Sequence, residues 1–281
     1  MQLSILIRNL NEAKSLQQTL LSLKRQQTDF EYEIVVIDNE SDDDSVEIAT
    51  AMGCKVFTLK RSEFTFGHSL NYGIGLCKGE VILILSAHVI LLNEFFLQNI
   101  HPYFKDPNIA ALRFLQSVSQ EEVVNGLKTG PRKLSYSDST NFAADNWKKL
   151  MVNHCAAIRR LCWLQVPFDE KILASEDKAW SLVILKKGYS ILYNIPGFYV
   201  YAKPFGRTTK MKRSIIEEAA KEMITGKTEP IYSVPYTRSL FKKITSGFKR
   251  ISFDLKIHKQ IYKGIKEYKK KYNDHFIKKE I

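Results

Sequence analysis

The sequence predicts an α/β fold with a mostly parallel, doubly wound sheet. Apolar segments of strand length alternate with segments in which apolar residues recur at helical spacing, as in Leu3–Ile7 followed by Leu16, Leu20 and Leu23. Strands that alternate with helices pair in parallel and are joined by right-handed crossovers. The 281 residues, of which 44% are hydrophobic, are sufficient for a large buried core.

Further elements follow along the first 205 residues. We expect strands at residues 33–38, 55–59, 81–85, 109–114, 189–193 and 198–201, helices through 46–49, 93–104 and 180–186, and a strand that passes into a helix at 153–160. The uniformly apolar segment 81–85 is typical of a central strand. Residues 116–150 are polar and weakly patterned, which suggests an excursion with some helix that reads an acceptor substrate.

The net charge of +12 is unevenly distributed. Residues 206–281 contain 20 Lys and Arg against 8 Asp and Glu, whereas residues 1–205 contain 22 of each kind. The whole excess therefore belongs to the C-terminal quarter. This asymmetry predicts a neutral domain of residues 1–205 followed by a basic helical extension of residues 206–281.

The N-terminus and the cysteines indicate a cytoplasmic location. No basic region followed by an apolar run and a cleavage site opens the chain, and no segment stays apolar for the roughly 18 residues that a membrane span needs. The four cysteines lack Cys-x-x-Cys spacing and a secretory context, so we expect reduced thiols.

Polar residues follow three of the predicted strands, at Arg8–Glu12, Asp38–Ser41 and Ser86–His88. In doubly wound sheets, ligands bind beyond the carboxyl ends of the strands. Asp38 can accept hydrogen bonds from the base or ribose of a nucleotide, with a loop-capping role as the alternative. His88 has two interpretations, a ligand-binding residue at this edge of the sheet or a structural histidine. No glycine-rich fingerprint follows the first strand, which disfavours a classical dinucleotide fold or a P-loop.

An acidic pair, Glu176 and Asp177, lies between a loop and a predicted helix. Carboxylates at a helix start commonly cap the helix and interact with its dipole. The second interpretation is catalytic, with Asp177 as a general base.

Several motifs in order resemble glycosyltransferase family 2 proteins of the GT-A fold, particularly the bacterial branch of rhamnosyltransferase-like polysaccharide enzymes. The match runs from residue 3 to about residue 201, and the order of the motifs is more specific than any one of them. The motifs are Ile7–Glu12, Glu33–Asp42, Phe64–Asn71, Gly79–His88, Ala157–Arg160 with Trp163, Pro167–Glu170, Glu176–Asp177 and Gly188–Tyr193.

The resemblance implies an inverting transfer of a sugar from a nucleotide-diphosphate donor to an acceptor hydroxyl, in the synthesis of a surface polysaccharide or another glycan. Asp177 matches the acidic base, and Glu176 orients a neighbour or caps the helix. The implied nucleotide-binding residues are Arg8, Asn9, Glu12, Asp38, Asn71, Ser86 and His88, of which the last two face the diphosphate. The alternative is a catalytically degenerate GT-A protein that binds nucleotide and acts as a scaffold.

Three departures from the family pattern bear on a divalent metal. Ser86-Ala87-His88 stands where the family has Asp-x-Asp, Leu70 replaces a common arginine, and Tyr199–Tyr201 occupies the usual place of a histidine, where Lys203 or Arg207 are substitutes. Mg²⁺ and Mn²⁺ need oxygen-rich coordination. Two alternatives follow: His88 supplies one ligand to Mn²⁺, or a metal-free site uses His88 and nearby cations to neutralise the diphosphate.

The basic extension has two segments with apolar residues at helical spacing, 240–251 and 257–272, with lysines on the other positions. Cationic amphipathic helices bind anionic membrane surfaces. This interpretation places the protein on the inner face of the membrane, next to a lipid-linked acceptor. The alternative is packing on the domain or on a second subunit of a homo-oligomer. Nucleic acid is disfavoured, because the aromatic residues lie within the apolar stripes.

Overall fold

The computed structural model describes residues 2–116, 120–172, 174–202, 217 and 220–225. The chain divides into two compact units, one of residues 1–172 and 176–204 and one of residues 173–175 and 205–281. Most of the second unit, including the predicted amphipathic segments 240–251 and 257–272, lies outside the described residues. The division into 1–205 and 206–281 therefore stays a prediction. Within the described ranges, no helix is long and apolar enough to cross a membrane.

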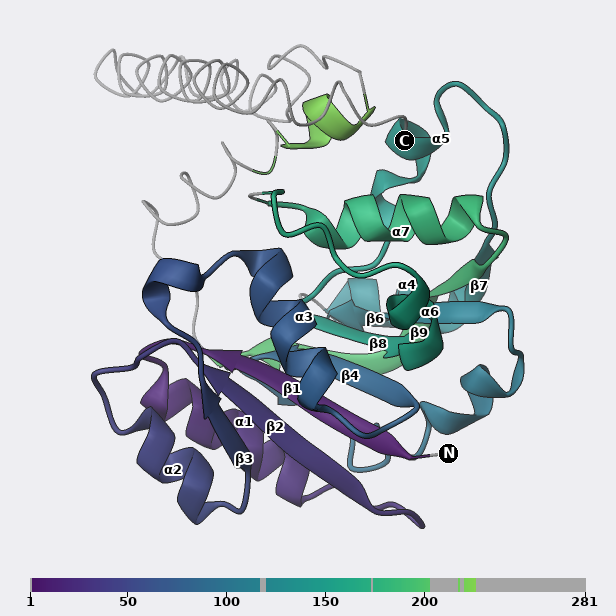
Figure 1. Cartoon of the computed structure of the whole chain (residues 1–281). Coiled ribbons are helices and arrows are strands. Elements are labelled where there is room, and N and C mark those ends of the chain that lie inside the picture. Colours follow the sequence, from purple (N-terminus) through teal and green to yellow (C-terminus); the bar gives the residue numbers. More distant parts are fainter. Residues whose placement is uncertain (1, 117–119, 173, 203–216, 218–219, 226–281) are drawn as a thin grey trace, which may run out of the picture. The chain divides into compact units, whose positions relative to one another are not determined.

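The first unit is built on a nine-stranded mixed sheet with helices on both faces (Figure 1). Its strands are β1 (Leu3–Asn9), β2 (Tyr32–Asp38), β3 (Lys55–Thr58), β4 (Val81–Ser86), β5 (Val89–Leu91), β6 (Ile109–Gln116), β7 (Arg132–Leu134), β8 (Cys155–Arg159) and β9 (Ser190–Tyr201). Its α-helices are α1 (Ala13–Lys24), α2 (Ser45–Ala51), α3 (Phe66–Leu76), α4 (Gln120–Thr129), α5 (Phe142–Asn146), α6 (Arg160–Gln165) and α7 (Glu176–Lys186), and its 3-10 helices are η1 (Arg61–Glu63), η2 (His101–Lys105) and η3 (Trp147–Lys149).

The strand order is β3-β2-β1-β4-β8-β6-β9-β5, with β7 also paired to β9. Strands β3, β2, β1 and β4 are parallel, and β6 is parallel to β9. Strand β8 runs antiparallel to both of its neighbours, β4 and β6. The predicted α/β class with a mostly parallel sheet is confirmed, and β4 is central as expected. Because β8 is reversed, its first residue, Cys155, lies beside Leu85 near the carboxyl end of β4.

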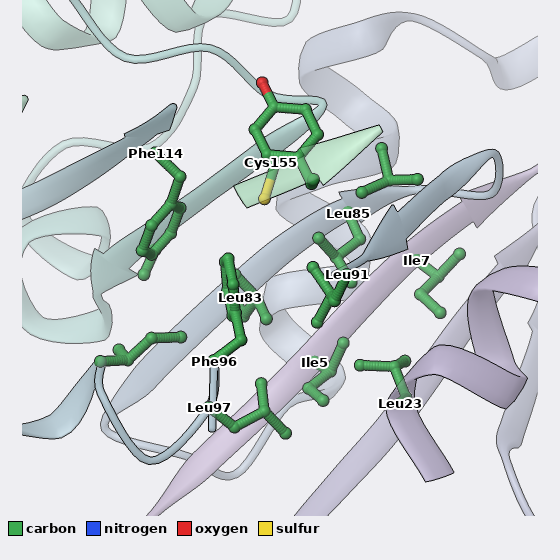
Figure 2. Packing of buried hydrophobic residues seen from close by; sticks show 14 of the residues in the cluster. Ile5, Ile7, Leu23, Leu83, Leu85, Leu91, Phe96, Leu97, Phe114 and Cys155 are labelled. Atoms are coloured by element: carbon green, nitrogen blue, oxygen red, sulfur yellow. The ribbon is translucent and has the colours of Figure 1, made fainter. Parts of the chain in front are cut away.

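Alternate residues of β1 bury against different helices, as the period of two in a strand requires. Ile5 and Ile7 belong to the cluster that includes the apolar stripe of α1, whereas Leu6 contacts α3 at Gly73. Figure 1 shows α1 and α3 on opposite faces of the sheet. Figure 2 shows part of the core on the α1 face, where the labelled residues are Ile5, Ile7, Leu23, Leu83, Leu85, Leu91, Phe96, Leu97, Phe114 and Cys155.

The predicted helix at 93–104 is wrong. The segment forms consecutive turns followed only by η2, although Phe96, Ile100 and Phe104 are buried as the pattern predicted. Pro102 has no N–H to donate and restricts the residue before it, which opposes a helix across this position. Gln26, which follows α1, supplies other hydrogen bonds, since its Nε2 donates to the Asn93 carbonyl and its Oε1 accepts the Leu97 N–H.

The two short strands predicted at 189–193 and 198–201 are one strand, β9. Its pairing with β6 shifts register at several points instead of breaking. Asn194 has a left-handed φ of 62°, and its side chain donates to the carbonyl oxygens of Gly126 and Gly130. These bonds fix the irregularity and hold α4 against β9.

Two glycines of α3 give a matched test of the packing. A Cβ at Gly67 would lie 2.5 Å from the Asp169 carbonyl oxygen, whereas a Cβ at Gly75 would meet nothing within 4 Å. Gly67→Ala is expected to destabilise the fold by about 2 kcal/mol through overpacking. Gly75→Ala is expected to stabilise it by about 0.5 kcal/mol, because alanine loses less backbone entropy in a helix. Urea unfolding measures both variants, and changes of the same sign would contradict this account.

Candidate active site

The ends of β1 and β2 form a hydrogen-bonded loop cluster. Asn9 and Asp38 are adjacent across the two strands, and both are nearly inaccessible at 3% and 2% exposure. Asn9 Nδ2 donates to Asp38 Oδ1 at 2.8 Å, and Asp38 also accepts the Ser41 N–H at 2.8 Å and the Ser41 hydroxyl at 2.6 Å. The Asp38 carboxylate thus holds the loop after β2 in place. Direct contact of Asp38 with a nucleotide stays a prediction.

The residues after β4 lie at the same edge, because Arg8 of β1 pairs with Ser86 of β4. His88 Nδ1 lies 4.0 Å from Glu12 Oε1, and the His88 ring packs edge-on against Tyr201 with centroids 5.2 Å apart. The Ser86 N–H donates to the His154 carbonyl oxygen at 3.1 Å. The structure therefore brings together the predicted residues Glu12, Ser86 and His88.

Asn153 binds both members of the acidic pair at the start of α7. Its Nδ2 donates to Glu176 Oε1 at 2.7 Å, and its backbone N–H donates to Asp177 Oδ2 at 3.0 Å. Glu176 is 5% exposed. Burial first, and then the neighbouring Asp177 charge, raise the pKa of Glu176 to about 7, against the opposing effect of Arg8. Asp177 is only partly buried and is the more accessible carboxylate.

Arg8 lies near the carboxyl end of β1 and interacts electrostatically with the acidic pair. Burial lowers the pKa of its guanidinium, while the charges of Glu176 and Asp177 act in the opposite direction. Its Nη1 donates to the Phe66 carbonyl oxygen at 3.3 Å, and its buried Nε has no hydrogen-bond partner among the described residues. Arg8 is therefore a cation placed to interact with both carboxylates.

The side-chain amide of Asn71 is fully engaged within the protein, and its contact with a nucleotide stays a prediction. Its Nδ2 donates to the Phe168 carbonyl oxygen and to Glu170 Oε1, both at 2.9 Å. Its Oδ1 accepts the Trp163 Nε1–H at 2.9 Å and the Phe168 N–H at 3.0 Å. Asn71 joins α3 to the segment after α6, so two of the family-like motifs form one structural contact.

Four residues of this region were not predicted as site residues: Arg113, Asn153, His154 and Tyr199. His154 Nε2 lies 2.6 Å from the Tyr199 hydroxyl oxygen, and burial raises the pKa of Tyr199 well above its usual range. Burial lowers the pKa of Arg113, whereas Tyr199 and Asp177 oppose this shift. Arg113, His154 and Tyr199 line a cavity of about 480 Å³ between β6, β9 and α4. The sequence signal that could have identified Asn153 and His154 as site residues is their position as a polar pair directly before an apolar strand.

Left-handed backbone occurs at three non-glycine residues next to these elements. Asn11 after β1 has φ of 53°, Glu40 after β2 has φ of 56°, and Ser175 before α7 has φ of 64°. Such conformations cost of order 1–3 kcal/mol each and cluster at functional sites. These three residues therefore lie in the same segments as the candidate site residues, after β1, after β2 and before α7.

The residues at this edge do not fit a hard divalent cation. In the part of the chain that the structure describes, no three His, Cys, Asp or Glu side chains are grouped so that they could hold a metal ion. Ser86 and His88 offer a hydroxyl and an imidazole where Mg²⁺ or Mn²⁺ prefers several carboxylate oxygens. We therefore derive no step that passes through a metal.

Residues 4–164, more than half of the chain, match Glycosyl transferase family 2. The chain belongs to this family, which confirms the resemblance drawn from the motifs. Two similar curated proteins are O-antigen chain rhamnosyltransferases. RfbN of Salmonella typhimurium is 28% identical over 203 residues, covering 69% of this chain and 64% of that protein. WbaN of Salmonella anatum is 26% identical over 178 residues, covering 60% of this chain and 56% of that protein. Both matches span less than two thirds of the relative's own length.

Solved structures show the same fold at low sequence identity. The mannosyltransferase PcManGT from Pyrobaculum calidifontis, in complex with GDP-Man and Mn²⁺, is 16% identical with a TM-score of 0.60 and covers 95% of this chain and 82% of its own. S. aureus TarS 1-349, in complex with UDP-GlcNAc, is 16% identical with a TM-score of 0.59 and covers 94% and 82%. These likenesses confirm the expected GT-A type of fold.

Proposed function

We propose that this chain is an inverting glycosyltransferase that moves a sugar from a nucleotide-diphosphate donor to an acceptor hydroxyl, with Asp177 as the general base. The observation that carries the proposal is the meeting of three groups at one sheet edge: the loop cluster after β1 and β2, the residues after β4, and the acidic pair of α7. Arg8 interacts electrostatically with that pair, and it pairs in the sheet with Ser86. Membership of Glycosyl transferase family 2 supports the same reaction class.

The chemistry requires one base and a stabilised leaving group. The acceptor oxygen attacks the anomeric carbon, the bond from that carbon to the diphosphate oxygen breaks, and the acceptor proton passes to Asp177. A carboxylate suits this task, because the proton leaves late, as the new bond forms, and no extreme pKa is needed. Asn153 orients the Asp177 side chain through its backbone N–H. The second lone pair of each carboxylate oxygen stays available to the acceptor.

The two curated relatives support a rhamnose donor and a surface-polysaccharide acceptor as the first pair to test. The proposal also retains a lipid-linked glycan acceptor and a cytoplasmic location on the inner face of the membrane through the basic extension. The competing function is a catalytically degenerate scaffold that binds nucleotide. The departure from the family pattern at Ser86-Ala87-His88, where the family has Asp-x-Asp, is the observation that favours this second candidate.

Transfer without a metal is the expected result of a direct test. Thermal-shift screening of UDP-, GDP- and dTDP-linked sugars identifies the donor, and nucleoside-diphosphate release is then measured with EDTA and with added Mn²⁺. We expect rates within about twofold of each other, because Arg8 supplies a positive charge and His88 a hydrogen-bond donor that stabilise the leaving diphosphate. Loss of activity in EDTA that Mn²⁺ restores would contradict the metal-free mechanism. Donor binding without release by any donor would favour the scaffold.

A further inference from the structure

The cavity between β6, β9 and α4 is the second chemical feature of the molecule. It has a volume of about 480 Å³, within the range of small-molecule sites. Tyr193 provides a half-buried aromatic ring, and Gln116 and Asn125 provide amides, whereas Phe114 and Tyr199 are only 5% and 1% exposed. An aromatic face combined with amide groups suits a ligand that has both an apolar ring face and hydroxyl groups, as a sugar has.

Arg113 gives this cavity a charge. Its guanidinium carries five N–H donors and stays protonated in proteins. The guanidinium makes no hydrogen bond or ion pair with any residue that the structure describes, although the residue is partly buried and the charges of Tyr199 and Asp177 act on it. Arg113 is half-buried, and its donors, which no described side chain occupies, are available to an anion bound in the cavity. The composition of the cavity wall therefore favours a sugar that bears a negative group.

The sheet order separates this cavity from the loop cluster after β1 and β2. The loop cluster belongs to β1 and β2, whereas the cavity belongs to β6 and β9, and β4 and β8 lie between them. Residues 153 and 154 join the two regions. Asn153 holds Asp177, and the next residue, His154, lines the cavity and accepts the Ser86 N–H on its carbonyl oxygen.

We propose that this cavity is the acceptor subsite and that Arg113 selects an acceptor sugar that carries an anionic group. The acceptor role rests on the proposed function, whereas the anion site rests on the cavity and on the Arg113 guanidinium that lines it. A carboxylate of an acidic sugar and a phosphate on a sugar share the chemistry that Arg113 recognises. The bidentate geometry of guanidinium toward either oxyanion is the same.

The test is a titration of the full-length protein with three probes: glucose, glucuronic acid and glucose 1-phosphate. Binding is followed by ligand-observed NMR with the nucleotide edge saturated by the nucleoside diphosphate of the donor. We expect at least one anionic probe to bind about tenfold more tightly than glucose, and Arg113→Gln to abolish this preference. Tighter binding of glucuronic acid indicates an acceptor with a carboxylate, and tighter binding of glucose 1-phosphate indicates an acceptor with a phosphate.

Two variants control for charge and fold. Arg132→Gln removes an exposed cation of β7 outside the cavity and should keep the preference. Arg113→Lys keeps the charge and should retain part of it. Thermal unfolding of each variant confirms that the fold is intact.

The opposing outcomes are distinct. Equal binding of the three probes, binding of none up to their solubility limit, or a preference that survives in Arg113→Gln overturns the anion site. Weaker nucleoside-diphosphate binding in Arg113→Gln also overturns it, because Arg113 would then belong to the donor. If the anionic probes bind more tightly than glucose but no donor releases its nucleoside diphosphate, the acceptor role and the proposed function are refuted together. If nucleoside diphosphate is released but the anionic probes are not preferred, only this inference is refuted.

Discussion

Asp177→Asn is expected to slow nucleoside-diphosphate release from the donor by about a thousandfold, within the range that a positioned general base contributes. A thousandfold loss corresponds to about 4 kcal/mol of transition-state stabilisation. The amide cannot take the acceptor proton as the new glycosidic bond forms. Steady-state kinetics at saturating donor measure the change directly.

The controls must separate chemistry from folding at this position. Asp177 Oδ1 accepts the Lys178 N–H at 2.7 Å and Oδ2 accepts the Asn153 N–H at 3.0 Å. An asparagine presents an NH₂ group to one of these donors, so the thermal unfolding of Asp177→Asn and its donor binding are measured alongside the rate. Asp145→Asn removes an exposed carboxylate of α5 and should leave all three unchanged. An unchanged rate in Asp177→Asn with intact donor binding would refute the base assignment.

The location of the ligand edge was predictable because it depends only on strand direction in the first half of the sheet. Leu3–Ile7 and the segments 33–38 and 81–85 were recognisable as parallel strands, so the polar residues after them had to meet. The register confirms this geometry, since Asn9 pairs with Asp38 and Arg8 pairs with Ser86. The roles of these side chains toward a nucleotide are not contained in that geometry and stay predictions.

The second half of the site could not be predicted from strand direction, because β8 is antiparallel. A parallel strand would place its first residues at the far edge of the sheet, but Cys155 at the start of β8 pairs with Leu85 at the end of β4. Asn153 and His154 therefore lie at the ligand edge. Arg113 was hidden for a different reason. Its strand was predicted, yet the cavity that it lines depends on the irregular pairing of β6 with β9.

A sequence motif can also carry a structural contact instead of chemistry. The segments Phe64–Asn71 and Pro167–Glu170 both belong to the motifs that resemble the family. In the fold they bind each other, through Asn71 and through His68 Nδ1, which lies 3.0 Å from Glu170 Oε2. The close approach of Gly67 to Asp169 belongs to the same contact. Spacing in one sequence cannot distinguish such tertiary contacts from a binding site.

The wild-type protein is expected to lose stability between about pH 4.5 and pH 7 because of Glu176. The pKa of this carboxyl is raised to about 7 in the fold from its ordinary value of 4.5. Below pH 4.5 the folded and unfolded chains both hold the proton. Between pH 4.5 and pH 7 only the unfolded chain has released the Glu176 proton, so the free energy of unfolding falls as the pH rises. Above pH 7 the loss is complete and amounts to about 3 kcal/mol.

Glu176→Gln isolates this contribution, since glutamine resembles the protonated acid and its Oε1 can still accept the Asn153 Nδ2–H. Thermal unfolding at pH 5 and pH 8 should show that the wild-type melting temperature falls by about 5–10 °C relative to the variant. Glu63→Gln, which changes an exposed carboxylate, should follow the wild-type protein at both pH values. Parallel pH dependence of wild type and Glu176→Gln would show that Glu176 is already ionised at pH 5. A neutral Glu176 has a direct consequence for mechanism, because it leaves Asp177 as the sole negative partner of Arg8 in the acidic pair.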